Sequence, residues 1–268
     1  MSSNATITIT FGDQAENHVG MQKLGAMAPD GFSPSELEAA KTLIEADTTF
    51  KSMAGARCEI IELNNALPAG ITPLPERAVV LVVRKGVDFI LAKGHFGQHD
   101  IWNELSGLKW DTKAKMYGRV VNKHARYNLC FGDTAQAPDY DNGKGTVVDF
   151  PSIPCTEFIR DELPKYFGMK ADKLQAEGNF YYDVSKCGLG WHGDQERRRV
   201  IAIRLGADMD LHYQWFQNSN PIGNTVKLTL HTGDLYVMSE KAVGTDVKKK
   251  KIATLRHAAG ASKYLDLK

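Results

Sequence analysis

The sequence predicts a mainly β protein with flanking helices, and three observations lead to this expectation. Short apolar segments rich in β-branched and aromatic residues recur after residue 110, with turn residues between them. Of the 268 residues, 43% are hydrophobic and 24% are charged, which is typical of a folded globular chain. A chain of this length can bury a large core without disulfides. Short strands at regular spacing favour an antiparallel sandwich or open barrel.

The charge and cysteine content exclude several classes of protein. Lys and Arg number 33 against 32 Asp and Glu, so no field of the whole molecule attracts a polyanion, and any contact with nucleic acid must be local. The four cysteines have no CxxC spacing and are too few for a secreted disulfide scaffold. No apolar run is long enough to cross a membrane, and no targeting signal is visible. We therefore expect an intracellular protein of the cytoplasm or nucleus, with no membrane partner.

Residues 1–75 differ in pattern from the rest, and we expect them to form an N-terminal extension of unknown role with one helix. Ser33, Pro34 and Glu36 have the spacing of an N-cap, a first-turn proline and a capping box, which predicts a helix ending near Asp47. The proline-rich stretch 67–77 then precedes an apolar run typical of a buried strand. These signals predict a boundary near residue 75 and a domain over 76–268.

The second half of the chain contributes most of the expected strands. They lie at 200–205, 211–216, 225–230 and 234–238. One helix is expected at about 155–167, because Phe158, Ile159 and Leu163 recur at helical spacing.

The segment His192-Gly193-Asp194 precedes the first of these strands, and His257 follows the last. Two imidazoles and one carboxylate are the protein ligands of non-haem iron(II) oxygenases. In an extended strand, residues i and i+2 point to one side, so His192 and Asp194 can bind a single ion. An isolated HxD is more often a surface or capping pair than a metal site. The surrounding segments must therefore distinguish the two interpretations. His231 is the rival third ligand.

Several short segments between residues 126 and 257 resemble the AlkB family of iron(II)- and 2-oxoglutarate-dependent dioxygenases, in the order that the family has them. The Asn-Phe-Tyr of 179–181 matches the family's NxY, and His192, Asp194 and Glu196 match its HxDxE. The other matching segments are Ala125 to Asp133, Asp139-Tyr140-Asp141, Val200 to Gly206, Gly233 to Met238 and Arg256-His257. The resemblance covers a core of about 115–268.

The resemblance implies a double-stranded β-helix core of the jelly-roll type and a role for each matching residue. His192, Asp194 and His257 would bind Fe(II) at the catalytic centre. Asn179 and Tyr181 would hydrogen-bond the cosubstrate 2-oxoglutarate, since an amide and a phenol both offer donors to a carboxylate. The residues implied for substrate binding are Arg126, Tyr140 and Glu196.

The implied reaction is oxidative demethylation of an N-alkylated nucleobase in DNA or RNA, with release of formaldehyde. A base in a duplex would have to be flipped out, at a cost of a few kcal/mol. Single-stranded or damaged nucleic acid is therefore the expected partner. The lysine run 248–251 could add contacts to phosphates.

The chain departs from the family after His257. AlkB-type proteins close with a strand of the form RxNxxxR, in which an arginine anchors the distal carboxylate of 2-oxoglutarate, and this pattern is missing. A positive group must still pair with a buried carboxylate, because an unpaired buried charge is costly. Lys263 is the first candidate for this anchor. Arg204, in the middle of an otherwise apolar strand, is the second.

Several of these residues also have an ordinary structural interpretation. Tyr140 could be an exposed loop aromatic, Glu196 could pair with Arg197 or Arg198, Arg126 could donate to backbone carbonyls, and Lys263 could lie in a frayed terminus. Two other functions stay open as alternatives. One is a dioxygenase of the same fold that hydroxylates a protein side chain or small metabolite, and the other is a non-catalytic nucleic-acid-binding module. The sequence predicts no oligomeric state.

Overall fold

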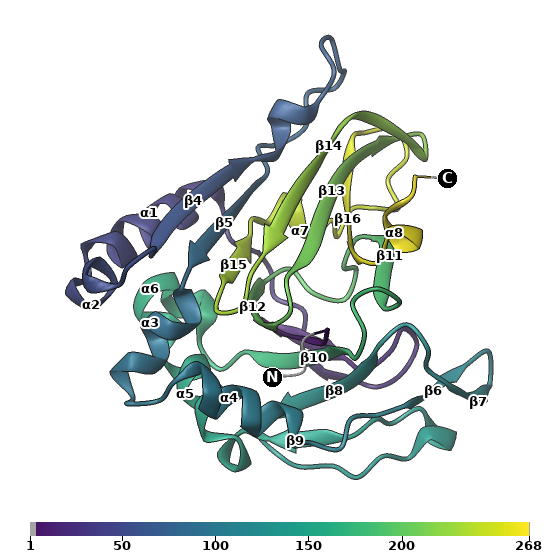
Figure 1. Ribbon diagram of the computed structural model, residues 1–268. Helices are drawn as coiled ribbons and strands as arrows, with labels where there is room; N and C mark the ends of the chain where they lie inside the picture. The colour runs from purple at the N-terminus through teal and green to yellow at the C-terminus, as the bar shows by residue number, and fades with distance from the viewer. Residues whose placement is uncertain (1–3, 268) are drawn as a thin grey trace.

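The computed structural model describes residues 4–267, and two β-sheets dominate it (Figure 1). The first has eight strands in the order β4 (Arg57–Glu62), β5 (Val79–Arg84), β15 (Leu235–Met238), β12 (Val200–Gly206), β1 (Thr6–Gly12), β10 (Gln175–Tyr181), β8 (Tyr127–Gly132) and β9 (Val147–Asp149). The second has four strands in the order β11 (Gly188–His192), β16 (Thr254–Gly260), β13 (Met209–Gln217) and β14 (Asn220–Leu230). The mainly β prediction is confirmed.

Two hairpins and several helices complete the described chain. The hairpins are β2 (Gln14–Glu16) with β3 (Lys23–Gly25), and β6 (Lys113–Met116) with β7 (Arg119–Asn122). The α-helices are α1 (Pro34–Ala46), α2 (Thr48–Ser52), α3 (Gly86–Lys93), α4 (Gln98–Ser106), α5 (Pro154–Glu162), α6 (Pro164–Phe167), α7 (Glu240–Val243) and α8 (Ser262–Leu265). The 3-10 turns are η1 (Leu63–Ala66), η2 (Tyr140–Asn142), η3 (Phe150–Ser152) and η4 (Gly168–Ala171).

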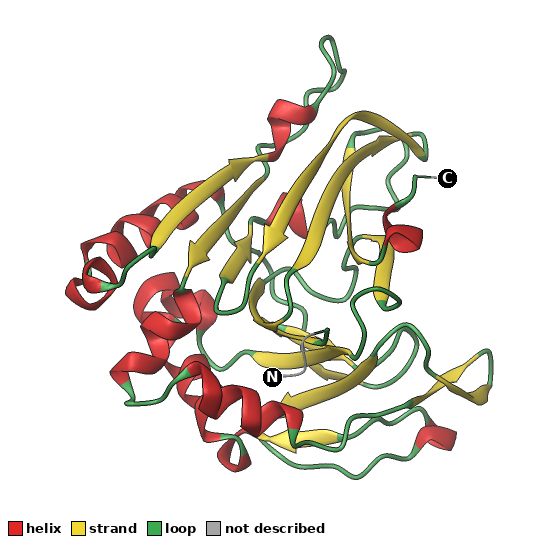
Figure 2. Ribbon diagram, in the orientation of Figure 1, coloured by secondary structure: helices red, strands yellow, loops and turns green. Residues whose placement is uncertain are grey.

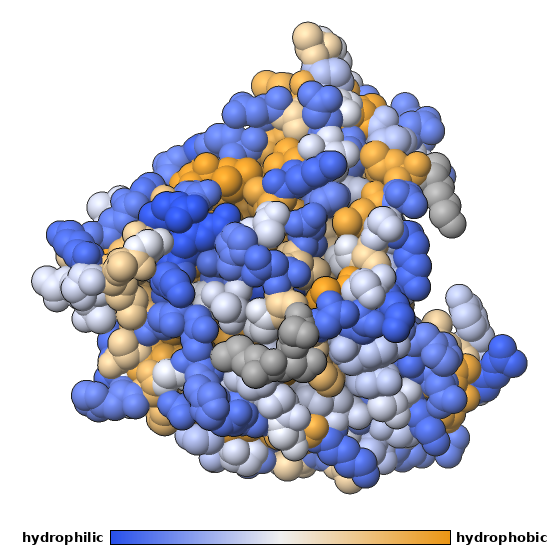
Figure 3. Space-filling model, viewed as in Figure 1, coloured by the Kyte–Doolittle hydropathy of each residue, from blue (hydrophilic) through white to orange (hydrophobic). Residues whose placement is uncertain are grey.

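The eight-stranded sheet is buried on both faces, which divides the interior into two cores. On one face, Ile7, Ile9 and Phe11 pack in a core with helix residues such as Leu37 and Ile159. Figure 2 shows the longer helices gathered beside this sheet, away from the four-stranded one. The other face packs against the four-stranded sheet, in a core that includes Val80, Val82, Tyr213, Trp215 and Leu255. Polar residues cover most of the face seen in Figure 3, with some apolar residues over β4 and β5.

The helix start predicted at Ser33 and the strands predicted in the second half of the chain are confirmed. Ser33 caps α1 with the full capping box to Glu36, and Asp47 is the C-cap. The four predicted strands are β12, β13, β14 and β15. The predicted helix at 155–167 is divided into α5 and α6 at Pro164, whose ring and missing N–H interrupt the helical hydrogen bonds. None of the helices in the described chain is long and apolar enough to span a membrane.

The N-terminal region differs from the expected extension. Strand β1 pairs with β12 on one side and with β10 on the other, so residues 6–12 lie inside the eight-stranded sheet. Strand β4 pairs with β5 across the expected boundary near residue 75. The strands at 6–12 and 57–62 therefore hydrogen-bond within the same sheet as strands of the domain expected at 76–268.

Candidate metal centre

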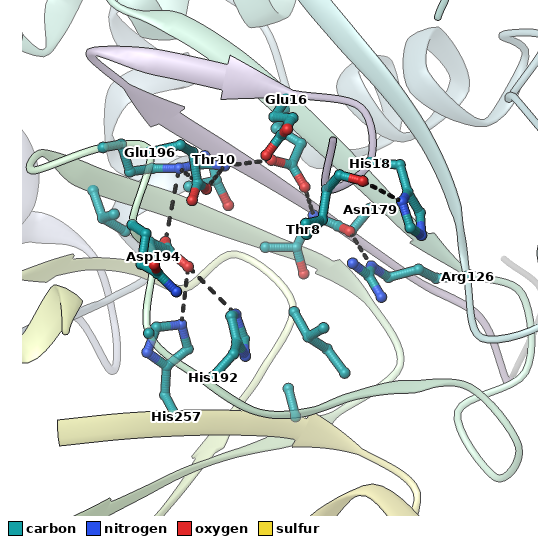
Figure 4. A pocket seen from close by; sticks show the side chains of 18 of the residues that line it. Thr8, Thr10, Glu16, His18, Arg126, Asn179, His192, Asp194, Glu196 and His257 are labelled. Carbon is teal, nitrogen blue, oxygen red and sulfur yellow. Dashed lines mark hydrogen bonds and ion pairs between the residues drawn. The ribbon is translucent and has the colours of Figure 1, made fainter. Parts of the chain in front are cut away.

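Three side chains expected at the metal site lie together. His192, the last residue of β11, is in register with His257 on β16. The Nε2 atom of His192 is 3.3 Å from Oδ1 of Asp194, and Nε2 of His257 is 3.6 Å from the same oxygen. The ligand atoms of all three residues lie within 4.8 Å of one another (Figure 4). This spacing allows the three groups to bind one metal ion.

A close approach between two loops positions Asp194. A Cβ atom on Gly193 would lie 2.2 Å from the carbonyl oxygen of Gly244, so only glycine fits there. The backbone N–H of Asp194 donates to the carbonyl oxygen of Val243 at 3.0 Å. The residue between the two predicted ligands is thus a glycine because the turn after α7 packs directly on it.

The protonation states also suit a metal. Nδ1–H of His192 donates to the carbonyl oxygen of Gly190 at 2.8 Å, which leaves the Nε2 lone pair free toward Asp194. Burial lowers the pKa of His257, and the neighbouring His192 lowers it further. Burial alone would raise the pKa of Asp194, yet its contacts with His192 and His257 and the charge of Arg197 hold it well below its usual range. Neutral imidazoles and a carboxylate are the forms that bind metals.

Arg197 is a part of the site that the sequence did not single out. Its side chain is buried, and its Nε lies 3.7 Å from Oδ2 of Asp194. Its Nη2 donates to Glu177 at 2.5 Å and to Glu196 at 2.7 Å. The charges of Glu177, Asp194 and Glu196 raise the pKa of Arg197 against the effect of burial. In the sequence, Arg197 is the first of three consecutive arginines, and nothing local distinguishes the buried one.

The three residues line a cavity of about 580 Å³. Five other predicted site residues line the same cavity, namely Arg126, Asn179, Tyr181, Glu196 and Arg204. Oδ1 of Asn179 accepts hydrogen bonds from Arg126 Nε at 2.5 Å and from Asn128 at 2.7 Å. Glu196 pairs with Arg197, as the structural interpretation expected, and borders the cavity as well. The first lysine of the basic run, Lys248, is exposed and also lies on the cavity wall.

Arg204 is the most unusual of these residues. It is 1% exposed and lies on β12 among apolar neighbours. Its Nε and Nη1 atoms have no hydrogen-bond partner among residues 4–267. A buried guanidinium without a carboxylate partner is costly, and an anion bound in the cavity would offset that cost.

The other three candidates lie elsewhere. Lys263 is exposed on α8, with its ammonium 5.0 Å from the Tyr264 ring centroid, and it does not line the cavity. The hydroxyl of Tyr140 donates to Asp111 at 2.8 Å, which holds this residue in η2 away from the cavity wall. His231 lies 2.8 Å from Asp208 and is half-exposed, so it is not the third ligand of the cluster. Lys263 and Tyr140 are therefore not among the residues that line this cavity, and their roles as anchor and substrate contact stay predictions.

The N-terminal region supplies cavity residues that were not expected. Thr8 and Thr10 come from β1, and Glu16 and His18 from the β2–β3 hairpin (Figure 4). The alternation of Thr and Ile over residues 6–10 is a period-two strand pattern, and it was the available signal for this part of the sheet.

The fold and the cavity define this chain as a mainly β protein with a candidate metal-binding cavity between its two sheets. No protein-family model matches the chain. It is 48% identical over 260 residues to "Uncharacterized protein R156" of Acanthamoeba polyphaga mimivirus, and the alignment covers 97% of each chain. The chain belongs to the same family as this viral protein.

Proposed function

We propose that this protein is an Fe(II)- and 2-oxoglutarate-dependent dioxygenase that oxidatively demethylates N-alkylated nucleobases in DNA or RNA. The observation that carries the proposal is the convergence of His192, Asp194 and His257 in a cavity whose wall also holds the buried Arg204, with Nε and Nη1 lacking a partner among residues 4–267. Neither feature alone would distinguish an oxygenase from another metal-binding protein.

The strand order supports a double-stranded β-helix of the jelly-roll type as the core. From β10 to β13 the chain passes alternately between the two sheets, and it does so again from β15 to β16. The four-stranded order β11, β16, β13 and β14 lies opposite β10, β1, β12 and β15 of the larger sheet. In such an arrangement His192, at the end of β11, and His257, in the middle of β16, lie beside the inner face of the larger sheet.

The donor set fits iron(II). Two imidazole nitrogens and one carboxylate oxygen on one side of an ion leave its other positions open, which is the arrangement of non-haem iron oxygenases. The carbonyl oxygen of Gly190 orients His192, and the side chain of Arg197 orients Asp194. Metal ligands are usually held in this way by neighbouring groups. Iron(II) bound there would supply the activation of dioxygen that couples decarboxylation of 2-oxoglutarate to oxidation of a C–H bond.

The cavity offers separate groups for the cosubstrate. Arg204 supplies a positive charge for one carboxylate of 2-oxoglutarate, and its location in the sheet keeps water from competing. Tyr181, which is also buried, adds a phenol on the same wall. Asn179 is held in place by Arg126 and Asn128. These residues hold the cosubstrate while the metal ligands hold the ion.

The remaining wall holds three carboxylates, those of Glu16, Glu177 and Glu196, beside basic residues that include Arg197. These carboxylates suit a cationic group, such as an N-alkylated base that bears a positive charge. Burial raises the pKa of Glu16, and the charges of Glu196 and Glu177 act in the same direction, against a hydrogen bond from the backbone of Gly20 and the charge of Lys23. The volume lies within the range of small-ligand sites, so one extruded base fits the proposal better than a duplex. Lys248 at the cavity is positioned to contact a phosphate.

Two assays on the purified protein test the proposal. With Fe(II), we expect succinate to form from 2-oxoglutarate, and formaldehyde to be released from single-stranded N-methylated oligonucleotides. His192→Ala should abolish both products, while His231→Ala, which changes a histidine outside the cluster, should leave both unchanged. Formaldehyde from methylated peptides alone would favour the protein-hydroxylating alternative. Absence of succinate under all conditions would favour a non-catalytic binding module.

A further inference from the structure

Strand β1 occupies a distinctive position in the fold. In the four-stranded sheet, β16 lies between β11 and β13. In the eight-stranded sheet, β1 lies between β10 and β12, the strands that directly precede β11 and β13 in the chain. If the alternation between sheets continued beyond β16, the next strand would fall in this same position. The N-terminal strand fills it instead.

This position aligns three cavity residues from distant parts of the chain. In the register of the sheet, Thr8 is paired with Asn179 on β10 and with Arg204 on β12. All three residues line the cavity. Adjacent strands are about 4.8 Å apart, so the side chains of one such row are near neighbours. The row Asn179, Thr8 and Arg204 therefore forms a continuous polar strip across three strands.

The hydroxyl of Thr8 is buried and has no partner in the described part of the chain. Thr8 as a whole is 5% exposed. Thr6, which lies on the same face of the same strand, donates its hydroxyl to the carbonyl oxygen of Ala207. A buried hydroxyl normally has a hydrogen-bond partner. Thr8 and Arg204 thus place two unsatisfied donor groups beside each other on the cavity wall.

From this arrangement we infer that β1 is part of the cosubstrate site, and that the Thr8 hydroxyl and the Arg204 guanidinium together bind the distal carboxylate of 2-oxoglutarate. The inference rests on the proposed function and assigns a binding residue to a segment expected to be an extension. A carboxylate satisfies both unpaired groups at once, because it accepts several hydrogen bonds through its two oxygens. In this arrangement β1 supplies the hydroxyl, while the cation lies on its neighbour β12.

Calorimetric titration of 2-oxoglutarate into the Mn(II)-loaded protein under argon tests this inference without turnover. Thr8→Val removes the hydroxyl and keeps the shape, and we expect it to weaken 2-oxoglutarate binding by about 10- to 100-fold, the usual effect of losing a hydrogen bond to a charged group. Thr8→Ser should restore the affinity to near the wild-type value. Thr6→Val is the matched control, because its hydroxyl is occupied by Ala207, and it should leave the affinity unchanged.

A second ligand separates a lost contact from a disturbed site. In 2-oxopentanoate a methyl group replaces the distal carboxylate, so its affinity should be the same in the wild type and in Thr8→Val. Equal loss for both ligands, or no loss for 2-oxoglutarate, would overturn the role of Thr8. The proposed function would still stand after such a result for Thr8, provided that the wild type binds 2-oxoglutarate and Arg204→Leu does not. A wild type that binds Mn(II) but no 2-oxoglutarate would overturn both.

Discussion

His192 and His257 face each other across β11 and β16, with their ring centroids 4.3 Å apart. Their Nε2 atoms approach the same oxygen of Asp194. Because the three residues come from two strands and a loop, the site exists only when β11 and β16 are paired.

We expect one equivalent of Mn(II) or Fe(II) to bind to this cluster. Removing a direct ligand should weaken binding by more than the roughly 10- to 100-fold typical of supporting residues. His257→Ala and Asp194→Ala should therefore lose stoichiometric metal, measured by calorimetry and by elemental analysis after dialysis. His231→Ala should bind as the wild type does. Undiminished binding in His257→Ala would exclude this cluster as the metal site.

Arg197 should act as a positioning residue for Asp194. Arg197→Lys keeps the charge but loses the fork that contacts Glu177, Glu196 and Asp194. We expect metal affinity to fall by about 10- to 100-fold. Arg198→Lys is the control, because Arg198 pairs with Glu240 instead. Equal metal affinities in the two variants would show that Asp194 needs no support from this side.

Arg204 should be unfavourable for stability in the absence of a bound anion. Arg204→Met replaces a buried, unpartnered charge with an apolar chain of similar length, and should raise the free energy of unfolding by about 1–4 kcal/mol in urea titrations. The same variant should no longer be stabilised by added 2-oxoglutarate. Lys263→Met should alter neither property, since Lys263 is exposed. A destabilised Arg204→Met would show instead that the guanidinium is satisfied within the fold.

Lys123 gives a prediction for the alkaline range. Its pKa is lowered from 10.5 to about 8, mainly by burial, with Asp111 opposing the shift and Arg126 adding to it. Between these two values the unfolded chain holds a proton that the folded chain has lost, so stability gains from rising pH. Relative to Lys123→Met, the wild type should gain on the order of 1–2 kcal/mol between pH 8 and 10.5. Parallel stability curves for the two proteins would contradict the shift.

The position of β1 predicts a large effect from a residue near the N-terminus. Ile9 is fully buried in the core shared with the helices, so Ile9→Ala should lower the free energy of unfolding by about 2–5 kcal/mol. Val19→Ala, at a side chain that is 84% exposed, should change it by less than about 0.5 kcal/mol. Chemical denaturation distinguishes the two cases. Similar small effects would mean that β1 does not contribute to the core.

The features that local patterns determine were predictable. The capping box at Ser33, the strands of the second half and the pairing of Glu196 with Arg197 each depend on residues close in sequence. The convergence of His192, Asp194 and His257 was anticipated through the ordered motifs of a family resemblance, because spacing alone cannot state which strands become neighbours.

Features set by tertiary pairing could not be obtained in this way. Nothing in the sequence around Thr8 indicates that it pairs with both Asn179 and Arg204. Of the three adjacent arginines, Arg197 is the one that the fold buries. Arg204 is also buried and lines the cavity, whereas Lys263 does not line it. Which residues become buried or line the cavity depends on the order of the strands in the sheets. The periodicity of a single sequence does not specify that order.

The central location of β1 also bears on biosynthesis. Residues 6–12 leave the ribosome early, yet their hydrogen-bonding partners at 175–181 and 200–206 are translated much later. The nascent chain must therefore keep an apolar β-forming segment unpaired for most of synthesis, a condition that exposes it to aggregation.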